Sequence, residues 1–303
     1  LWQVQTKHQE KLEEEIMCGI VGGTSERNIL PILVEGLKRL EYRGYDSAGV
    51  AFKKNGSIDV VKNAGRVKQL EKKLNLKQNS TNLGIAHTRW ATHGVPSEKN
   101  AHPHASKDIF VAHNGIIENH EELKKNLRSE GVRFSSQTDS EVIAHLVQYY
   151  IEKGQSFEKA VFNAVKKLKG AYALGILNKN EPEQLIGVRN QSPLVLGKGF
   201  QENFIASDVM ALAPVTNKFV YLEDGQAAIM SKSKVDVRSE TNKKVRIKTH
   251  EVDSNAYTTD LEGHNHFMEK EIFEQPRAIR DSIEGRLTKT ESQEGIFGAG
   301  FEK

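Results

Sequence analysis

The sequence predicts an α+β fold, layered and mainly antiparallel, and two observations support this prediction. Between residues 18 and 251, short apolar runs rich in β-branched residues alternate with stretches of helical periodicity. Several neighbouring strand-like runs are separated by short turn signals, of which Asn55-Gly56 is the clearest. Hairpin-like pairs of this kind favour an antiparallel sheet packed against helices over a wound parallel sheet.

The first half of this region is expected to hold five strands and one early helix. The run "CGIVGG" begins the first strand, and residues 28–42 form the helix, because apolar side chains from Ile29 to Leu40 recur at helical spacing. The other strands are expected over "SAGVAF" (47–52), "SIDVVKNAG" (57–65), "NLGIAHTRW" (82–90) and "DIFVAHNGII" (108–117).

Three helices and a second group of strands are expected in the remainder. The helical patterns cover residues 120–131, 139–154 and 157–170. Beyond the last strand, residues 252–265 are turn-rich and typical of a linker, and residues 266–285 look helical with a break at Pro276. The second group of strands is expected over 171–177, 183–188, 203–207, 219–225, 226–231, 234–238 and 244–252.

The composition excludes several classes of protein. A chain of 303 residues with 37% hydrophobic and 27% charged residues is ordinary for a globular protein. The net charge of +3 gives no electrostatic case for binding nucleic acid, and no apolar run approaches the roughly 18–20 residues that cross a membrane. The first 16 residues lack the apolar core of a secretory signal, so we expect a cytoplasmic protein.

Cys18 is the only cysteine, and it directly follows Met17 at the head of the first expected strand. A lone cysteine makes no intrachain disulfide. One interpretation is a small buried hydrophobic residue. The other is a nucleophile that must lie at or near a chain terminus, and the rest of the sequence has to decide between them.

Four short stretches carry dense polar side chains at the ends of expected elements. Taken singly, each has an ordinary structural explanation, such as a turn at Asn114-Gly115 or a helix cap at Thr138-Asp139. The histidine pairs at 102/104 and 264/266 lack a second group of ligands, so no metal site is expected. The stretches are "LEYRGYDSAG" (40–49), "HTRWATHG" (87–94), "HNGIIENH" (113–120) and "SSQTDSEV" (135–142).

Together with the cysteine, these stretches supply the groups that a thiol needs to hydrolyse an amide of an amino acid. Asn114 and the backbone N–H of Gly115 offer two donors for a developing oxyanion. Arg89 and Asp139 are of the types that bind an α-carboxylate and an α-ammonium. No histidine stands out as the base, but the α-amino group of an N-terminal Cys18, with a pKa of about 7.7–8.0, can take the thiol proton.

These stretches, in this order, resemble the signature of the class II, or N-terminal-nucleophile, glutamine amidotransferases. Within that class, "EYRGYDSAG", "HTRWATHG" and the later "HFMEKEIFEQP" are similar to the isomerising glutamine–fructose-6-phosphate aminotransferases. The resemblance covers residues 18–280. It implies the four-layer αββα sandwich of N-terminal-nucleophile hydrolases, L-glutamine as substrate, and no metal or organic cofactor for this half-reaction.

The resemblance also implies a role for each matching residue. Cys18 would form a γ-glutamyl thioester and release ammonia, Asn114 and Gly115 would form the oxyanion hole, and Arg43 would support the site around the cysteine.

Substrate binding is implied for a second set of residues. Arg89 would bind the glutamine carboxylate, helped by Thr92 and His93 on a loop that closes over the substrate with Trp90 beside it. Asp139 would take the substrate ammonium.

Two departures from the family pattern define the expected domains. Residues 1–17 precede Cys18 and leave it no free amine, so they are expected to be a misread start before Met17, a cleaved propeptide or a permanent block. Residues 18–251 form the glutaminase domain. The resemblance implies that residues 252–303 form a linker and the start of a missing sugar isomerase domain, through which alone fructose 6-phosphate would bind. It also implies a homodimeric full-length enzyme whose dimer contacts would lie largely in that missing part.

Two other functions stay open on the sequence. A non-catalytic glutamine-binding or regulatory domain, blocked by residues 1–17, would bind glutamine without turnover. Another class II amidotransferase would deliver its ammonia to a different acceptor.

Overall fold

The chain divides into two units, residues 1–257 and 258–303, and the elements named below all lie in the first. In the second unit the described positions are helical, in agreement with the helix expected from residue 266. The linker predicted over 252–265 lies outside the described residues apart from Val252, as do residues 1–17. This computed structural model describes residues 18–252, 269, 272–273 and 275–276.

One sheet has eight strands in the order β14-β11-β9-β10-β1-β4-β2-β3, and every pair of neighbours is antiparallel. Its centre is β1, which lies between β10 and β4 and follows Cys18 directly. The strands are β1 (Gly19–Ser25), β2 (Ser47–Lys54), β3 (Ser57–Ala64), β4 (Leu83–Arg89), β9 (Val195–Gly199), β10 (Glu202–Ala206), β11 (Lys218–Tyr221) and β14 (His250–Glu251).

The other sheet has six strands in the order β13-β12-β8-β7-β6-β5, again all antiparallel. The strands are β5 (His104–Ser106), β6 (Ile109–Gly115), β7 (Tyr172–Asn178), β8 (Leu185–Asn190), β12 (Ala227–Met230) and β13 (Val235–Arg238).

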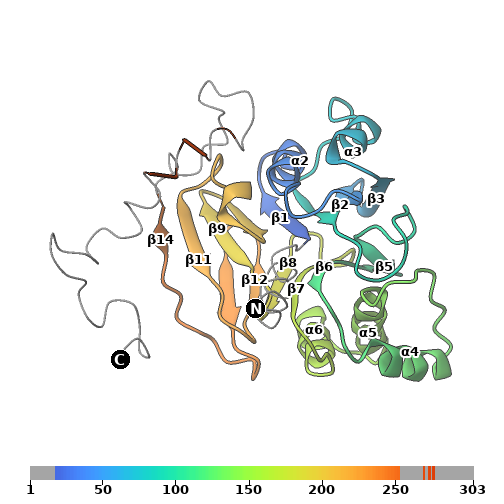
Figure 1. The fold of residues 1–303 in the computed structure, drawn as a ribbon. Helices are drawn as coiled ribbons and strands as arrows, with labels where there is room; N and C mark the ends of the chain where they lie inside the picture. Colours follow the sequence, from blue (N-terminus) through green and yellow to red (C-terminus); the bar gives the residue numbers. More distant parts are fainter. Residues whose placement is uncertain (1–17, 253–268, 270–271, 274, 277–303) are drawn as a thin grey trace, which may run out of the picture. The chain divides into compact units, whose positions relative to one another are not determined.

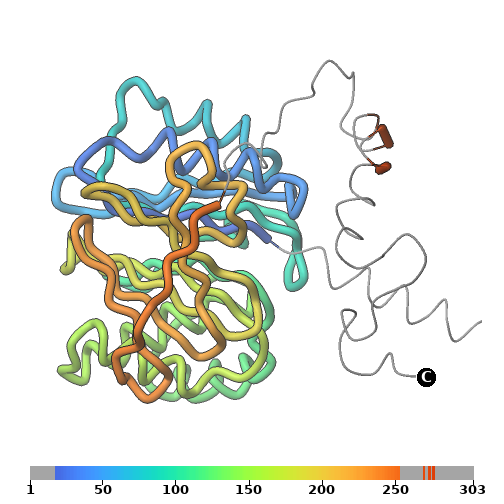
Figure 2. Tube along the Cα trace, turned by 90° about the vertical axis from the view of Figure 1, so that its left-hand side faces the viewer, coloured from blue at the N-terminus to red at the C-terminus, as the bar shows by residue number. Residues whose placement is uncertain are grey.

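Helices cover the outer face of each sheet, while the inner faces pack against each other. Helices α2 and α3 lie on one side and α4, α5 and α6 on the other, as Figures 1 and 2 show from two directions. The predicted α+β fold with four layers, αββα, is therefore confirmed. The helices are α2 (Leu30–Arg39), α3 (Val67–Leu74), α4 (His120–Ser129), α5 (Glu141–Glu152), α6 (Phe157–Val165) and the short 3₁₀ helix η1 (Val209–Ala211).

The strand period of two explains why β1 is apolar on both faces. Ile20 points into the core between the sheets, whereas its neighbour Val21 packs with Leu33 of α2 in the outer core. All three side chains are fully buried. A strand covered on both faces needs a continuous apolar run, which is what "GIVGG" provides.

The predicted hairpin at Asn55-Gly56 is confirmed. Lys54 pairs with Ser57, so the two residues between them form the whole loop. Both have positive φ, 50° for Asn55 and 76° for Gly56, as the tight turn between twisted strands requires.

The last predicted strand, over 244–252, is mostly wrong. Only His250 and Glu251 pair with β11, and a single bridge joins Lys244 to Arg238. Val245 and Ile247 still pack on the inter-sheet core, so their apolar alternation reflects burial without a ladder of backbone hydrogen bonds. Helix α3 and strands β5 and β9 were not predicted. None of the described helices is long and apolar enough to span a bilayer.

Candidate active site

Cys18 lies where the start of β1 meets the end of β4. The two strands pair with Gly19 opposite Thr88, which brings Trp90, just beyond β4, beside the cysteine. The backbone N–H of Trp90 donates to Cys18 Sγ at 3.2 Å, and Sγ lies 3.4 Å from the Trp90 carbonyl oxygen. Antiparallel register therefore places the cysteine against the stretch "HTRWATHG".

The thiol of Cys18 is not self-activated. Burial raises its pKa to about 11, although the Trp90 backbone hydrogen bond and the positive charge of Arg89 act in the opposite direction. At neutral pH the thiol therefore keeps its proton, and attack on a carbonyl carbon needs a base to remove it.

Asn114, near the end of β6, connects the cysteine to a distant part of the chain. Its Nδ2 donates to the Cys18 carbonyl oxygen at 2.7 Å and to Ser207 Oγ at 2.8 Å. Its Oδ1 is buried and has no partner among the described residues. Both amide hydrogens are thus engaged inside the protein, and one must be released before Asn114 can donate to a ligand.

Gly115 occupies a position that only glycine fits. Its φ is +110°, and a Cβ there would lie 2.0 Å from the carbonyl oxygen of Ala171. The glycine therefore lets β6 end in close contact with the chain that precedes β7.

Arg89, the last residue of β4, is a buried cation with an unused donor. Only 3% of its surface is exposed. Its Nη2 donates to the carbonyl oxygens of His93 and, at 3.4 Å, Gly94. Its Nη1 is buried without a partner in the described part of the chain. A buried guanidinium N–H of this kind is suited to an incoming carboxylate.

Asp139 is also buried, and its carboxylate bonds to the chain just after β6. Its Oδ2 accepts the backbone N–H of Ile117 at 2.8 Å, and its Oδ1 lies 3.3 Å from Ser140 Oγ and 3.9 Å from His93 Nδ1. It does not cap α5, whose N-cap residue Ser140 makes no side-chain capping bond. The capping interpretation of Thr138-Asp139 is therefore wrong.

A small pocket beside Cys18 brings together six of the predicted residues, while three lie outside its lining. Asn114 contacts Cys18 from behind, His93 lies near Asp139, and Arg43 forms an ion pair with Asp208 at 3.2 Å. The lining residues are Cys18, Arg89, Trp90, Thr92, His102, His113, Gly115, Thr138, Asp139 and Ser140.

Sequence reasoning missed the part played by Ser207. Its Oγ accepts from the Ile20 N–H at 2.7 Å as well as from Asn114. The available signal was a polar residue directly after the apolar run "NFIA", the same pattern that marked Arg89 and Asn114.

Four buried histidines lie at or beside the pocket, and two of them, His102 and His113, line it. His113 Nδ1 is 2.7 Å from Ser140 Oγ, and the ring of His102 stacks on that of His87 with 4.2 Å between ring centroids. Burial lowers the pKa of His87 to about 3 and lowers the pKa values of His102, His104 and His113 as well. These imidazoles are therefore neutral at physiological pH.

No group of three or more His, Cys, Asp or Glu among the described residues is arranged to hold a metal ion.

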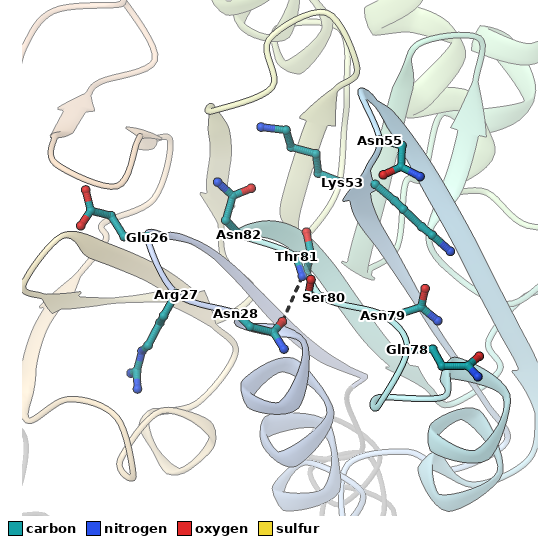
Figure 3. Close-up of a pocket in the computed structure, with 11 residues that line it drawn as sticks. Glu26, Arg27, Asn28, Lys53, Asn55, Gln78, Asn79, Ser80, Thr81 and Asn82 are labelled. Atoms are coloured by element: carbon teal, nitrogen blue, oxygen red, sulfur yellow. Dashed lines mark hydrogen bonds between the residues drawn. The ribbon is translucent and has the colours of Figure 1, made fainter.

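A separate polar pocket, shown in Figure 3, lies at the opposite ends of β1 and β4 from Cys18 and Arg89. Asn28, Lys53 and Thr81 line it, and it contains none of the residues predicted for the site.

Comparison with known proteins decides the family. Residues 87–214 match the model of the glutamine amidotransferase domain. The chain is also 50% identical over 271 residues to the isomerizing glutamine–fructose-6-phosphate aminotransferase of Acinetobacter baylyi. This chain contains a class II glutamine amidotransferase domain.

The alignment covers 89% of this amidotransferase chain but 44% of the Acinetobacter protein. The chain thus spans about half the length of the curated relatives it matches.

Solved structures agree on the fold. Glutamine phosphoribosylpyrophosphate amidotransferase from B. subtilis has a TM-score of 0.65 at 24% identity, and the match covers 76% of this chain and 50% of that one. An allosteric regulatory enzyme of purine biosynthesis gives the same TM-score of 0.65 at 26% identity, over 74% of this chain and 49% of that one.

Proposed function

We propose that this amidotransferase domain is the glutaminase half of an isomerising glutamine–fructose-6-phosphate aminotransferase. The domain comprises residues 18–251, residues 1–17 are absent from its active form, and residues 252–303 lead into a sugar isomerase domain. In the full-length enzyme, which we expect to be a cytoplasmic homodimer, the ammonia would convert fructose 6-phosphate into glucosamine 6-phosphate. The 50% sequence identity with the Acinetobacter relative supports fructose 6-phosphate as the acceptor.

The chemistry needs one nucleophile, one base and one oxyanion site. The Cys18 thiol gives its proton to its own free α-amine, and Sγ bonds to the carbonyl carbon of the glutamine side chain. Asn114 and the Gly115 N–H hold the oxyanion. The C–N bond then breaks, ammonia leaves with a proton returned by the amine, and water hydrolyses the thioester to glutamate.

Substrate recognition follows from two buried charges. The unpartnered Arg89 Nη1 receives the glutamine α-carboxylate, and Asp139 receives the α-ammonium. Trp90, Thr92 and His93 follow β4 without regular structure, and we propose that they move aside for glutamine and then close over it. Arg43, paired with Asp208, supports the segment that carries Ser207.

The observation that carries this proposal is the pocket itself, which lines up one thiol, one buried cation with a free donor and one buried carboxylate. An α-amino acid with an amide side chain is the ligand that matches all three.

The test measures glutamate release from L-glutamine by the 303-residue chain and by the same chain processed to begin at Cys18. We expect turnover by the processed form and its loss in Cys18→Ala. Ser80→Ala, in the pocket of Figure 3, is the control and keeps full activity. An unchanged rate in Cys18→Ala would overturn the proposal.

One observation favours a second function, a glutamine-binding domain without turnover. Both hydrogens of the Asn114 amide are engaged with Cys18 and Ser207, which leaves no amide donor for an oxyanion. Calorimetric binding of glutamine with no glutamate release, even by the form that begins at Cys18, would establish this function.

A further inference from the structure

Glu141, the first residue of α5, uses its buried carboxylate to hold the chain that comes before it. Its side chain is 3% exposed. Oε1 accepts the N–H and the hydroxyl of Ser135, both at 2.8 Å. Oε2 accepts the N–H of Ser136 at 2.6 Å and its hydroxyl at 2.7 Å. Two backbone and two side-chain donors therefore converge on one carboxylate.

The segment held in this way leads directly to the residues of the Cys18 pocket. Thr138, Asp139 and Ser140 lie between the two serines and Glu141, and all three line the pocket. Ser136 Oγ is also 3.0 Å from Thr138 Oγ1, so the bonds to Glu141 continue toward Asp139.

A second connection anchors Glu141 to the sheet. His145, one helical turn later, places Nε2 at 3.3 Å from Glu141 Oε1 and Nδ1 at 2.8 Å from Ser106 Oγ on β5. Burial alone raises the pKa of the Glu141 carboxyl, but the hydrogen bonds from His145, Ser136 and the Ser135 backbone outweigh it and hold the pKa well below its usual range. The group is ionised at neutral pH.

We propose that Glu141 is a positioning residue that sets the place of Asp139 and thereby the recognition of the substrate α-ammonium. This inference rests on the proposed function, in which Asp139 binds that ammonium. Glu141 does not line the pocket. It acts through the segment 135–139, whose backbone donors it holds in one arrangement.

The substitution Glu141→Gln tests these hydrogen bonds directly. Each carboxylate oxygen of Glu141 accepts a backbone N–H. In the variant Glu141→Gln, the side-chain NH₂ must therefore face a backbone N–H in either orientation of the amide. A hydroxyl can rotate away from that NH₂, but a backbone N–H cannot without moving the segment. Ser135→Ala removes one hydroxyl donor only and gives a graded variant.

The experiment is calorimetry on the form that begins at residue 18, which is the active form proposed above, with Cys18→Ala in every variant so that no turnover occurs. Two ligands are compared, L-glutamine and glutaramic acid (the monoamide of glutaric acid), which is glutamine without its α-amino group. Glu122→Gln on the exposed face of α4 is the matched control. Thermal melting of each variant is recorded to verify that it is folded at the temperature of the titration.

We expect Glu141→Gln to weaken glutamine binding about tenfold or more, because a misplaced Asp139 loses a charge-assisted hydrogen bond. Binding of the desamino ligand should change less than about twofold, Ser135→Ala should be intermediate, and Glu122→Gln should match the reference.

Two results would overturn the inference alone: equal losses for both ligands, which indicate a general structural role, or no loss for glutamine. If the reference chain fails to bind glutamine at all, the proposed function fails and this inference fails with it.

Discussion

At Gly115 the absence of one carbon atom decides whether β6 can end beside the pocket. A turn at Asn114-Gly115 and a pair of donors for an oxyanion were both predicted from the sequence. The contact with the Ala171 carbonyl oxygen was not, because it joins residues far apart in the chain. The residue type was predictable and its steric reason was not.

Gly115→Ala should therefore destabilise the domain by about 2–4 kcal/mol, since it combines a positive φ with a clash against backbone. Gly131→Ala is the control, because its φ of +86° is similar but nothing lies within 4 Å of its Cβ position. We expect Gly131→Ala to lower the free energy of unfolding by about 1 kcal/mol. Urea unfolding of both variants measures the difference, and equal losses would contradict the steric argument.

Arg89→Lys tests the unused donor of the buried guanidinium. Lysine keeps the charge but cannot bond the His93 carbonyl and present a second N–H to a carboxylate in the same geometry. We expect the KM for glutamine to rise about tenfold or more, with a smaller change in kcat. Arg27→Lys, at the partly exposed ion pair with Glu202, should leave both constants unchanged.

Among the elements, the two sheets meet around Ile205 of β10. Positions Gly22 of β1, Gly175 of β7 and Gly187 of β8 would each place a Cβ 3.0–3.1 Å from an Ile205 side-chain atom. The isoleucine therefore fills a space that glycines of both sheets leave open, and the sheets approach closely where the strands lack side chains.

Gly175→Ala should cost about 1–3 kcal/mol of stability through overpacking against Ile205 Cδ1. Ile205→Val removes that atom, so the double variant should lose less than the sum of the single losses by at least about 0.5 kcal/mol. Gly187→Ala is the control, since its nearest atom is Cγ2, which valine retains. Chemical denaturation measures the free energy of unfolding for each double-mutant cycle. Strictly additive losses for Gly175→Ala and Ile205→Val would contradict this packing.

The elements that the sequence analysis missed have identifiable causes. Helix α3 has Val67, Leu70 and Leu74 buried on one face, so its helical spacing was present but diluted by lysines. Strand β9 ends in "GKG", a composition typical of a turn. Residues 244–252 show the reverse case, where alternation suggested a strand but only two residues found a partner. Pairing depends on a neighbour that local sequence does not contain.

At the scale of the whole molecule, the buried histidines tie stability to pH. Burial lowers the pKa values of His87, His102, His104 and His113 in the folded domain, whereas the unfolded chain binds protons near pH 6.5. The unfolded state therefore binds more protons, so their stabilising contribution is complete above about pH 6.5 and is lost as the pH falls.

The free energy of unfolding should drop between pH 6.5 and 5, by up to about 1.4 kcal/mol per pH unit for each histidine. His104→Asn should reduce that slope, whereas the exposed His250→Asn should not. Urea unfolding across this range is the measurement. A flat profile would show that the cluster takes up protons without unfolding.

The two hydrogen bonds that Ser207 accepts have a consequence for the synthesis of the protein on the ribosome. One hydroxyl joins Ile20 to Asn114, so the surroundings of the cysteine remain incomplete until β10 has been made. At about 5–20 residues per second, a growing chain carries Cys18 outside the ribosome for roughly ten to forty seconds before that serine is available. During translation the thiol is therefore present well before the hydrogen bonds that complete its surroundings can form.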